Sequence, residues 1–576
     1  MDNSKNLSLH YWALAGVMTL GVALRFGNLD LKPLWLDEVL TALLSLGHRY
    51  KDVPLEVVFP ASTLQELLTL QPHRTCSAIA QAVATESTHP PLFFCLMHQW
   101  LNGMEPVAHT LSWKLRALPA LLGVAAIATT YAFNRIVFSP IAGLIGAAFM
   151  AVSPFAVYLS QEARHYTLPM LLIILALLGL MHIQHALYNR QQLPKLFVWL
   201  LWGIINSIGC YVHYFFILAF IAQLLTLTGL MYWRRRLLPQ GSWLAVTLVV
   251  VGVAVSYLPW LSVMLGSFGR AETGWLPKPQ HIAPLYQTVL AWLSMAIALP
   301  VESQPLWIQI PAVLLTIMFG GWVGWQGWQG LKALWQQPGT HLAILTLSGF
   351  ILCVLLQFAG MIYLLGKDIT VAPRYHFVYY PAVCVLLGAS FSSRKLKIIL
   401  PWGSQTIGSN PSSLLQPVTV FLFVSLLSCI FVVSNLAFLK SFHPQQVAKN
   451  MSLDKDVPIL MVVGYQNFQD VALGLSFALA IDQLHRDSLE GIAGASFAFF
   501  HREPSYEFVW QKLSKLSVLS APHLNLWVVA PGLRRRDYPP QLAMGKQTRC
   551  TIDPSQHYRI GIPYQLYRCV SIPHLT

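Results

Sequence analysis

The sequence predicts a polytopic α-helical membrane protein that ends in a small soluble α/β domain. Of its 576 residues, 55% are hydrophobic and only 10% are charged, whereas soluble proteins carry about 25% charged residues. The mean hydropathy is +0.54. Apolar windows of about 20 residues, which are long enough to cross a bilayer, recur up to residue 438. These observations exclude a disordered chain and a string of ordinary soluble domains.

Eleven apolar windows are predicted to span the membrane. They cover residues 9–27, 113–133, 139–159, 166–187, 196–213, 214–233, 242–263, 305–325, 341–365, 375–391 and 415–438. A further stretch, 284–300, is short and ends at Pro300, so we expect a re-entrant or interfacial helix there. The first window has no clear small-residue cleavage site and is followed by many others, which predicts a retained helix and not a removed signal peptide.

The basic residues predict the orientation of these spans. They are scattered or lie in short runs between apolar stretches, such as Arg234 to Arg236 and Arg394 to Lys397. Short basic runs are typical of cytoplasmic loops, so we expect the N-terminus inside and the C-terminal region outside the inner or plasma membrane. The net charge of +14 therefore does not indicate a nucleic-acid partner.

Two stretches are too long to be simple connections. The first is the outer loop 28–112, and the second is the tail from residue 439 to 576. In the tail, residues 457–464 and 524–530 have the pattern of buried strands, with helical patterns near 470–486 and 505–517 between them. We therefore expect a membrane domain over residues 1–438, including the first outer loop, and an extracytoplasmic α/β domain over 439–576.

The cysteines divide between these regions. Five of the eight fall in or beside apolar segments, where a thiol usually acts as a small hydrophobic side chain: Cys95, Cys210, Cys353, Cys384 and Cys429. Cys550 and Cys569 are the two cysteines of the tail. An oxidising compartment would join them in a disulfide, and two free thiols are the alternative. The sequence has no CxxC motif and no His/Cys cluster with zinc spacing.

Carboxylates are almost absent from the predicted membrane domain. Between Pro106 and Leu453 there are four, all on the outer face in this topology: Glu162, Glu272, Glu302 and Asp368. Ionisable groups at membrane level are costly and are usually functional or paired. A proton- or cation-coupled transporter would place acids near the bilayer midplane, so this distribution argues against such a transporter.

The first outer loop opens with the motif Leu34-Trp35-Leu36-Asp37-Glu38. Adjacent carboxylates repel each other, and desolvation would raise the pKa of one of them, which is the condition that suits a general base. Two solvated acids that cap an interfacial helix explain the same residues. Later in this loop, Thr88-His89-Pro90-Pro91 presents His89 at the start of a helix, either as a site residue or as an ordinary turn histidine.

The segment Ser160-Gln161-Glu162-Ala163-Arg164-His165-Tyr166 gathers an acid, a guanidinium, an imidazole and a phenol at the outer end of the third span. An arginine suits phosphate recognition because its fork of donors matches two oxygens at once. A Glu162–Arg164 ion pair, with Tyr166 in the aromatic belt, is the alternative.

The segment Pro373-Arg374-Tyr375-His376 lies at the outer start of the tenth span, where snorkelling of Arg374 is the alternative to a functional role. His213 and Tyr214 also fall at an outer boundary.

The order of these motifs resembles the GT-C membrane glycosyltransferases. A first helix followed by WLDE, then HPP, SQEARHY and PRY, is most similar to the bacterial glycosyltransferase family 39 proteins, which are relatives of the protein O-mannosyltransferases and the lipid A aminoarabinose transferase. The resemblance covers about residues 10–390. The tail matches only in kind, as a soluble domain after the last span.

The resemblance implies an inverting hexosyl- or pentosyltransferase. It would move a sugar from a polyprenyl phosphate to a lipid, glycan or protein acceptor at the extracytoplasmic face, among membrane lipids. Nucleotide sugars stay in the cytoplasm, so a donor for an outer site must arrive through the lipid. A glycosyl phosphate already has a good leaving group, so the reaction needs a base for the acceptor hydroxyl and a cation for the phosphate.

The resemblance also implies roles for individual residues. Asp37 would be the general base, with Glu38 orienting it or the acceptor, and Arg164 would hold the lipid phosphate with Arg374 as a second cation. The remaining motif residues would line the site: His89, Glu162, His165, Tyr166 and Tyr375.

Two questions stay open at this point. The chain offers few acids for a divalent cation beyond Asp37, Glu38 and Glu162, which favours a metal-independent reaction over a metal-dependent one. The competing function is a lipid-linked oligosaccharide transporter or flippase, which would need basic residues along a central cavity. A third candidate function is that of a non-catalytic membrane scaffold whose soluble tail binds a partner.

Overall fold

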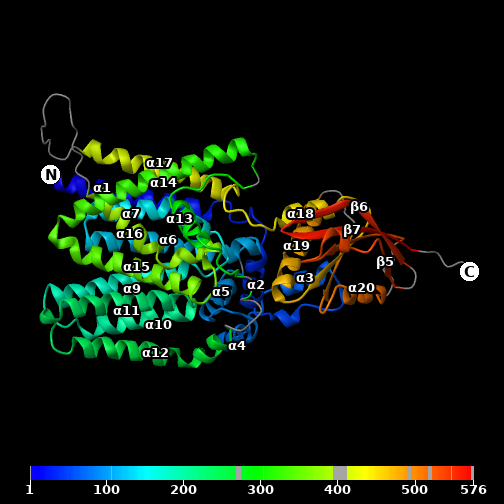
Figure 1. The fold of residues 1–576 in the computed structure, drawn as a ribbon, viewed down its shortest axis with the longest axis horizontal. Coiled ribbons are helices and arrows are strands. Elements are labelled where there is room, and N and C mark those ends of the chain that lie inside the picture. The colour runs from blue at the N-terminus through cyan, green and yellow to red at the C-terminus, as the bar shows by residue number, and fades with distance from the viewer. Residues whose placement is uncertain are drawn as a thin grey trace, which may run out of the picture. The chain divides into compact units, whose positions relative to one another are not determined.

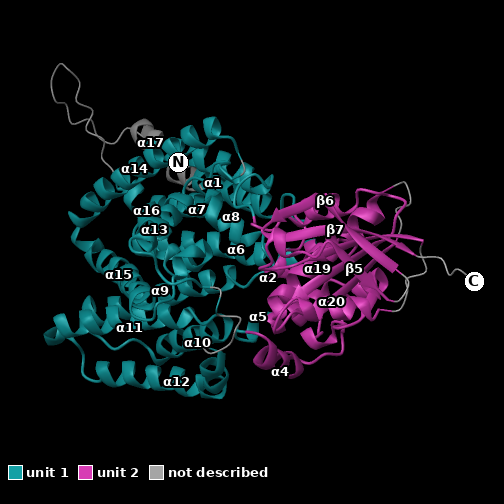
Figure 2. Cartoon of the chain, turned by 45° about the vertical axis from the view of Figure 1, so that its right-hand side comes forward, with its two compact units in different colours: residues 1–31, 88–93, 113–439 teal, residues 32–87, 94–112, 440–576 magenta. Residues whose placement is uncertain are grey.

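The computed structural model of the chain consists of two compact units (Figure 2). The helical unit comprises residues 1–31, 88–93 and 113–439, and the α/β unit comprises residues 32–87, 94–112 and 440–576. The structure describes residues 2–105, 107–267, 274, 276–302, 304–393, 411–488, 494–516, 522–545 and 548–571.

The helical unit consists mainly of apolar helices (Figure 1). Its helices are α1 (Asp2–Phe26), α6 (Leu111–Val137), α7 (Pro140–Val152), α8 (Pro154–Ser160), α9 (Thr167–Tyr188), α10 (Leu196–Val212), α11 (Phe216–Trp233), α12 (Ser242–Ser267), α13 (Ala283–Ser294), α14 (Leu306–Trp335), α15 (His341–Tyr363), α16 (Tyr380–Ser392) and α17 (Pro411–Val433). Short 3-10 turns include η5 (Ile369–Val371) and η6 (Pro373–Val378). Every predicted span overlaps a helix of this unit, so the polytopic helical fold is confirmed.

The number of membrane spans is judged from the length and hydropathy of each helix. Within the described residues, seven helices are long and apolar enough to cross a membrane, and α7 with α8 makes an eighth if this bent pair is one span. Three shorter apolar helices, α10, α16 and part of α17, coincide with the other predicted spans. The count of eleven therefore stays a prediction. The basic run at residues 394–397 and Glu272 lie outside the described residues.

One predicted span, 139–159, is broken in the structure. The helices α7 and α8 meet at Ser153 with a bend of 60°. Pro154 has no N–H and disfavours helical backbone at the preceding residue. Ser153 accordingly has extended backbone, and its hydroxyl caps α8 by accepting from the Ala156 N–H. The short helix α8 therefore runs in a different direction from α7 and is followed by the segment 161–166.

The α/β unit combines the first loop with the tail. The loop supplies α2 (Leu36–Ser45), η1 (Tyr50–Asp52), β1 (Val58–Pro60), α3 (Ala61–Leu67), α4 (Cys76–Glu86) and most of α5 (Leu92–Gly103). The tail supplies α18 (Pro444–Met451), β2 (Ile459–Tyr465), α19 (Phe468–Asp487), β3 (Ala495–His501), α20 (Glu507–Ser514), β4 (His523–Val529), β5 (Gln541–Met544), β6 (Thr548–Ile560) and β7 (Ile562–Ser571).

These strands form one seven-stranded sheet in the order β1-β3-β2-β4-β7-β6-β5. Strands β2, β3 and β4 are parallel, and the other neighbours pair antiparallel. The helix α20 packs on the face that carries Leu460 and Val462. Gly474 of α19 lies against Val463 and Phe499 on the opposite face. The sheet is therefore covered by crossover helices on both faces.

The strands predicted at 457–464 and 524–530 and the two helices between them are confirmed as β2, β4, α19 and α20. The division of the chain differs from the predicted one. Residues 32–87 and 94–112 belong to the same compact unit as the tail, because β1 pairs with β3 and the ring of Tyr50 lies 5.2 Å from that of Phe468.

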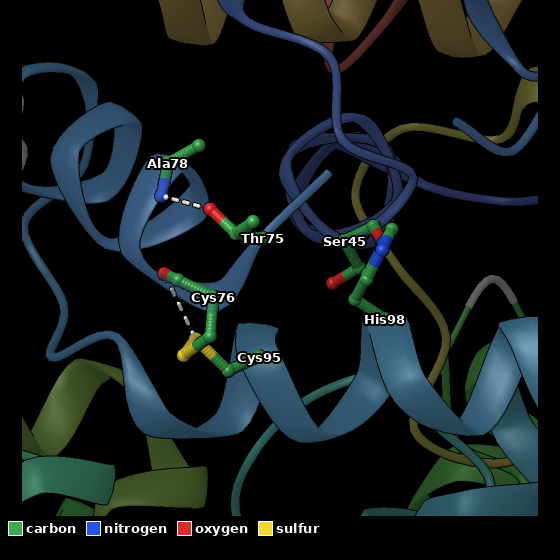
Figure 3. Close-up of a disulfide and its surroundings, with 6 residues drawn as sticks. All are labelled: Ser45, Thr75, Cys76, Ala78, Cys95 and His98. Atoms are coloured by element: carbon green, nitrogen blue, oxygen red, sulfur yellow. Dashed lines mark hydrogen bonds between the residues drawn. A yellow bond between two sulfur atoms is a disulfide. The ribbon is translucent and has the colours of Figure 1, made fainter. Parts of the chain in front are cut away.

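Two disulfides cross-link the α/β unit. The predicted pair, Cys550 and Cys569, joins directly opposed positions of β6 and β7. The second disulfide joins Cys76 to Cys95 (Figure 3), so the interpretation of Cys95 as a simple apolar side chain is wrong. Thr75 caps α4 by accepting from the Ala78 N–H at 3.2 Å, and Cys76 in the first turn bonds to Cys95 of α5. Cys210, Cys353, Cys384 and Cys429 are free.

Candidate functional site

Asp37 and Glu38 lie in the first turn of α2 in the α/β unit. Trp35 precedes the helix with extended backbone, and its N–H donates to Glu38 Oε2 at 3.3 Å. The Glu38 carboxylate is therefore a helix cap and is 1% exposed, whereas Asp37 is partly exposed. Glu38 therefore has the helix-capping role that is the alternative to a catalytic one. Asp37 is the acid of this pair that reaches the surface of the α/β unit.

The start of α2 is tied to the tail. The ammonium of Lys440 lies 4.0 Å from the centre of the Trp35 ring, within the range of a cation–π contact. Residues just after the first predicted span are thus packed against the beginning of the C-terminal segment, which fixes the direction in which the chain enters α2.

In the helical unit, the residues on either side of α8 form hydrogen bonds with the last turn of α1 and the residue after it. Arg25 is fully buried and donates to the carbonyls of Met150 and Ala151, at 2.8 and 3.0 Å, where α7 ends. Gln161, directly after α8, donates to the carbonyls of Leu24 and Gly27 at 3.2 and 2.7 Å. These bonds satisfy carbonyls at helix ends, which would otherwise stay unpaired, and they fix the segment 161–166.

Three histidines and Arg164 meet beside this segment. The ring of His165 lies 4.8 Å from that of His89 and 4.6 Å from that of His213. Arg164 Nη2 is 3.2 Å from His89 Nε2. Arg164 is 4% exposed and His165 is fully buried. We call His89, His165 and His213 the imidazole cluster.

Aromatic residues and a second arginine surround the imidazole cluster. The Tyr166 ring lies 4.8 Å from His165, and the Tyr375 ring lies 6.4 Å from His213. Arg374 lies over the ring of its neighbour Tyr375. Burial lowers the pKa of each of the three imidazoles well below the ordinary range, and Arg164 and Arg374 lower these pKa values further. Burial and the two neighbouring guanidinium charges therefore favour the neutral form of each imidazole.

The structure thus brings together most of the predicted site residues of the helical unit. His89, Arg164, His165, Tyr166 and Tyr375 are joined by the contacts above, and Glu162 is buried in the same turn as Arg164. Asp37 and Glu38 belong to the α/β unit. Their place relative to Arg164 stays a prediction.

The structure places His213, which the sequence marks only as a boundary residue, in the imidazole cluster. The signal was its position at an outer boundary between two apolar segments. A lone histidine there has no recognisable spacing to the other motifs, because the turn between α10 and α11 meets the segment 161–166 only in three dimensions. Within the described ranges, no three His, Cys, Asp or Glu side chains are arranged to hold a metal ion.

Comparison with known proteins identifies the fold. A family model described as dolichyl-phosphate-mannose-protein mannosyltransferase matches residues 88–260. The crystal structure of ArnT from Cupriavidus metallidurans bound to undecaprenyl phosphate matches with a TM-score of 0.54 and 12% identity, over 97% of each chain. The chain has the fold of a GT-C glycosyltransferase. The resemblance inferred from the motifs is confirmed.

The ArnT structure in the apo state matches with a TM-score of 0.51 and 12% identity, over 92% of this chain and 94% of that one. No curated protein sequence matches the chain. The matched region 88–260 of the family model contains His89, Arg164, His165 and His213. Both ArnT matches cover the tail as well as the helices, so the C-terminal strand-rich unit belongs to this architecture.

Proposed function

We propose that the protein is an inverting glycosyltransferase that uses a polyprenyl-phosphate-linked sugar. The observation that carries the proposal is that Arg164 and the three neutral imidazoles lie buried together in a GT-C fold. The helical unit that contains them has few acids. Such a group favours a phosphate anion over a cation. ArnT from Cupriavidus metallidurans was crystallised with undecaprenyl phosphate, and we extend this class of carrier lipid to the present chain.

The proposed reaction needs two functions from the protein. The acceptor oxygen bonds to carbon 1 of the sugar while the bond from carbon 1 to the phosphate oxygen breaks, and the lipid phosphate leaves. Asp37 takes the proton of the acceptor hydroxyl. Arg164, with Arg374 as second cation, stabilises the charge that develops on the departing phosphate. A single displacement inverts carbon 1, through a transition state with oxocarbenium character.

The two disulfides support an extracytoplasmic location for the α/β unit. Disulfides persist in oxidising compartments and are rare in the cytosol, and this unit holds both Cys76–Cys95 and Cys550–Cys569. Asp37 lies in the same unit. We therefore propose that acceptor activation takes place on the outer side of the inner or plasma membrane.

A transfer assay with the reconstituted full-length protein tests this function. Labelled undecaprenyl-phosphate hexoses and pentoses serve as donors, and membranes from cells that lack the gene supply the acceptor. We expect label to move to the acceptor, and Asp37→Asn to lower the rate about 10²–10⁴-fold, because a positioned base contributes about that much.

Glu66→Gln is the matched control, because Glu66 is an exposed acid on α3 of the same unit. It should transfer sugar like the wild type. Full activity of Asp37→Asn would remove Asp37 from the base role. Movement of the intact lipid-linked sugar across the bilayer without any transfer would overturn the proposed function in favour of a flippase.

A further inference from the structure

The protonation of the imidazole cluster can be assigned from its hydrogen bonds. The backbone N–H of Phe215 donates to His213 Nδ1 at 2.9 Å. A neutral imidazole carries one proton, and the nitrogen that accepts a hydrogen bond is the one without it. The proton of His213 is therefore on Nε2.

His213 Nε2 is buried and has no hydrogen-bond partner among the described residues. Both ring nitrogens of His165 are likewise buried without a partner in this part of the chain. Since a neutral imidazole always carries one N–H, each of these two rings presents a donor that no described residue satisfies. Burying an unsatisfied donor costs free energy, which a ligand with acceptor atoms would recover.

His89 has a different role in the cluster. A guanidinium can only donate, so His89 Nε2, at 3.2 Å from Arg164 Nη2, accepts the bond. This contact holds the guanidinium of Arg164 beside His165 and His213. His89 is therefore a positioning residue for Arg164.

The donor groups of the imidazole cluster and the positive charge of Arg164 favour an anionic ligand over a cation. A metal ion needs a lone pair on the ring nitrogen, and His213 Nε2 has none while Nδ1 accepts from Phe215. The positive charge of Arg164 also repels a cation. The two imidazole N–H groups and the guanidinium instead suit an anion that offers several oxygen acceptors, as a phosphate does.

We propose that His213 and His165 donate hydrogen bonds to the phosphate of the lipid-linked sugar and of the lipid phosphate that it releases, beside Arg164. The identity of the ligand rests on the proposed function. The inference adds His213 as a binding residue, gives His165 a defined role as a neutral donor, and makes His89 responsible for the orientation of Arg164.

Equilibrium binding of two lipids to the full-length protein in nanodiscs tests this inference. Undecaprenyl phosphate carries the phosphate, and undecaprenol has the same chain with a hydroxyl in its place. We expect His213→Phe to weaken the binding of undecaprenyl phosphate about 10-fold or more, because a hydrogen bond to a charged group is lost. Its affinity for undecaprenol should stay within about twofold of the wild type.

Two further variants complete the experiment. His213→Gln keeps an amide N–H near the position of Nε2 and should recover most of the affinity for undecaprenyl phosphate. His182→Phe removes an exposed histidine of α9 in the same unit and should bind both lipids like the wild type. Retained undecaprenol binding shows that His213→Phe is folded. If His213→Phe does not fold, His165→Phe, which removes the other proposed donor, takes its place, and its loss of affinity for undecaprenyl phosphate relative to undecaprenol is measured in the same way.

Equal binding of undecaprenyl phosphate by the wild type and His213→Phe would overturn the inference. Stoichiometric Zn²⁺ binding that His213→Phe abolishes would overturn it too, in favour of a metal site. The experiment distinguishes a failure of this inference from a failure of the proposed function. A wild-type protein that transfers sugar while His213→Phe binds normally refutes only the inference. A protein that binds the phosphate through His213 but transfers no sugar refutes only the function.

Discussion

In the α/β unit, Arg568 lies between the carboxylates of Asp454 and Asp553, at 2.7 and 2.9 Å. In the helical unit, the buried ring nitrogens of His165 have no partner within the described residues. Unpaired polar groups of this kind are expensive to bury, and a fold that stabilises only itself would not keep them. The first arrangement stabilises a domain, and the second is what a binding site for a polar ligand requires.

The same contrast extends beyond these two sites. The Glu56 carboxylate accepts from the His501 N–H and the Tyr465 hydroxyl and pairs with Lys512, which ties the first loop to the ends of β2 and β3. Two disulfides add covalent links in this unit. We therefore expect changes in the α/β unit to affect stability and changes at the imidazole cluster to affect ligand binding.

The largest expected effect on stability comes from the disulfide between β6 and β7. Replacing Cys550 and Cys569 by serine should destabilise the α/β unit by about 3 kcal/mol, because the bond no longer restricts the unfolded chain. Hydrogen exchange measured by mass spectrometry should show faster exchange in β6 and β7. Cys353→Ser, which changes a free thiol of the helical unit, is the control. Unchanged exchange in β6 and β7 would contradict the prediction.

A smaller effect is expected inside the helical unit. Gln223 accepts from Trp202 Nε1 and donates to Asn206 Oδ1, at 2.9 and 3.0 Å. A double-mutant cycle of Asn206→Ala and Gln223→Ala should give a coupling energy of about 0.6 kcal/mol, the usual value between helices in a membrane. Unfolding in mixed micelles measures it. A coupling of several kcal/mol would mean that this unit also relies on polar pairs for stability.

The smallest expected effect is the pH dependence that Glu56 confers. Burial alone raises its pKa, but the Lys512, His501 and Tyr465 hydrogen bonds bring it below the usual 4.5. Stability from this group is therefore present above about pH 4.5 and is lost as the pH falls through the folded pKa. The contribution is about 0.3 kcal/mol, since the pair is partly exposed. Glu56→Gln should flatten the acid side of the stability curve, and an unchanged curve would contradict this.

The sequence predicts the helices well because each is a long apolar window, and it predicts β2 and β4 because both are buried on two faces. It misses β6, most of whose residues are exposed or partly exposed, β7, whose sequence mixes Tyr, Gln and Arg with apolar residues, and β1, which has only three residues. The break at Ser153 follows from Pro154, yet a uniformly apolar window conceals it. Cys76 gives no local sign that Cys95 lies opposite.

The candidate site was predictable as far as its motifs extend. Arg164 and His165 stand next to each other in the sequence, and His89 follows a recognisable turn. The role of His213 depends on a contact between distant segments and on the backbone N–H of Phe215, neither of which leaves a local pattern. The capping of α2 by Glu38 likewise separates its role from that of Asp37 only in three dimensions.

In the proposed function, the helical unit binds a phosphorylated isoprenoid through Arg164, whereas Arg568 of the α/β unit only pairs with Asp454 and Asp553. Equilibrium binding of undecaprenyl phosphate to the full-length protein tests it, with Arg164→Gln compared with Arg568→Gln. We expect Arg164→Gln to lower the affinity about 10-fold or more and Arg568→Gln to leave it unchanged. Equal affinities of the wild type and Arg164→Gln would contradict it.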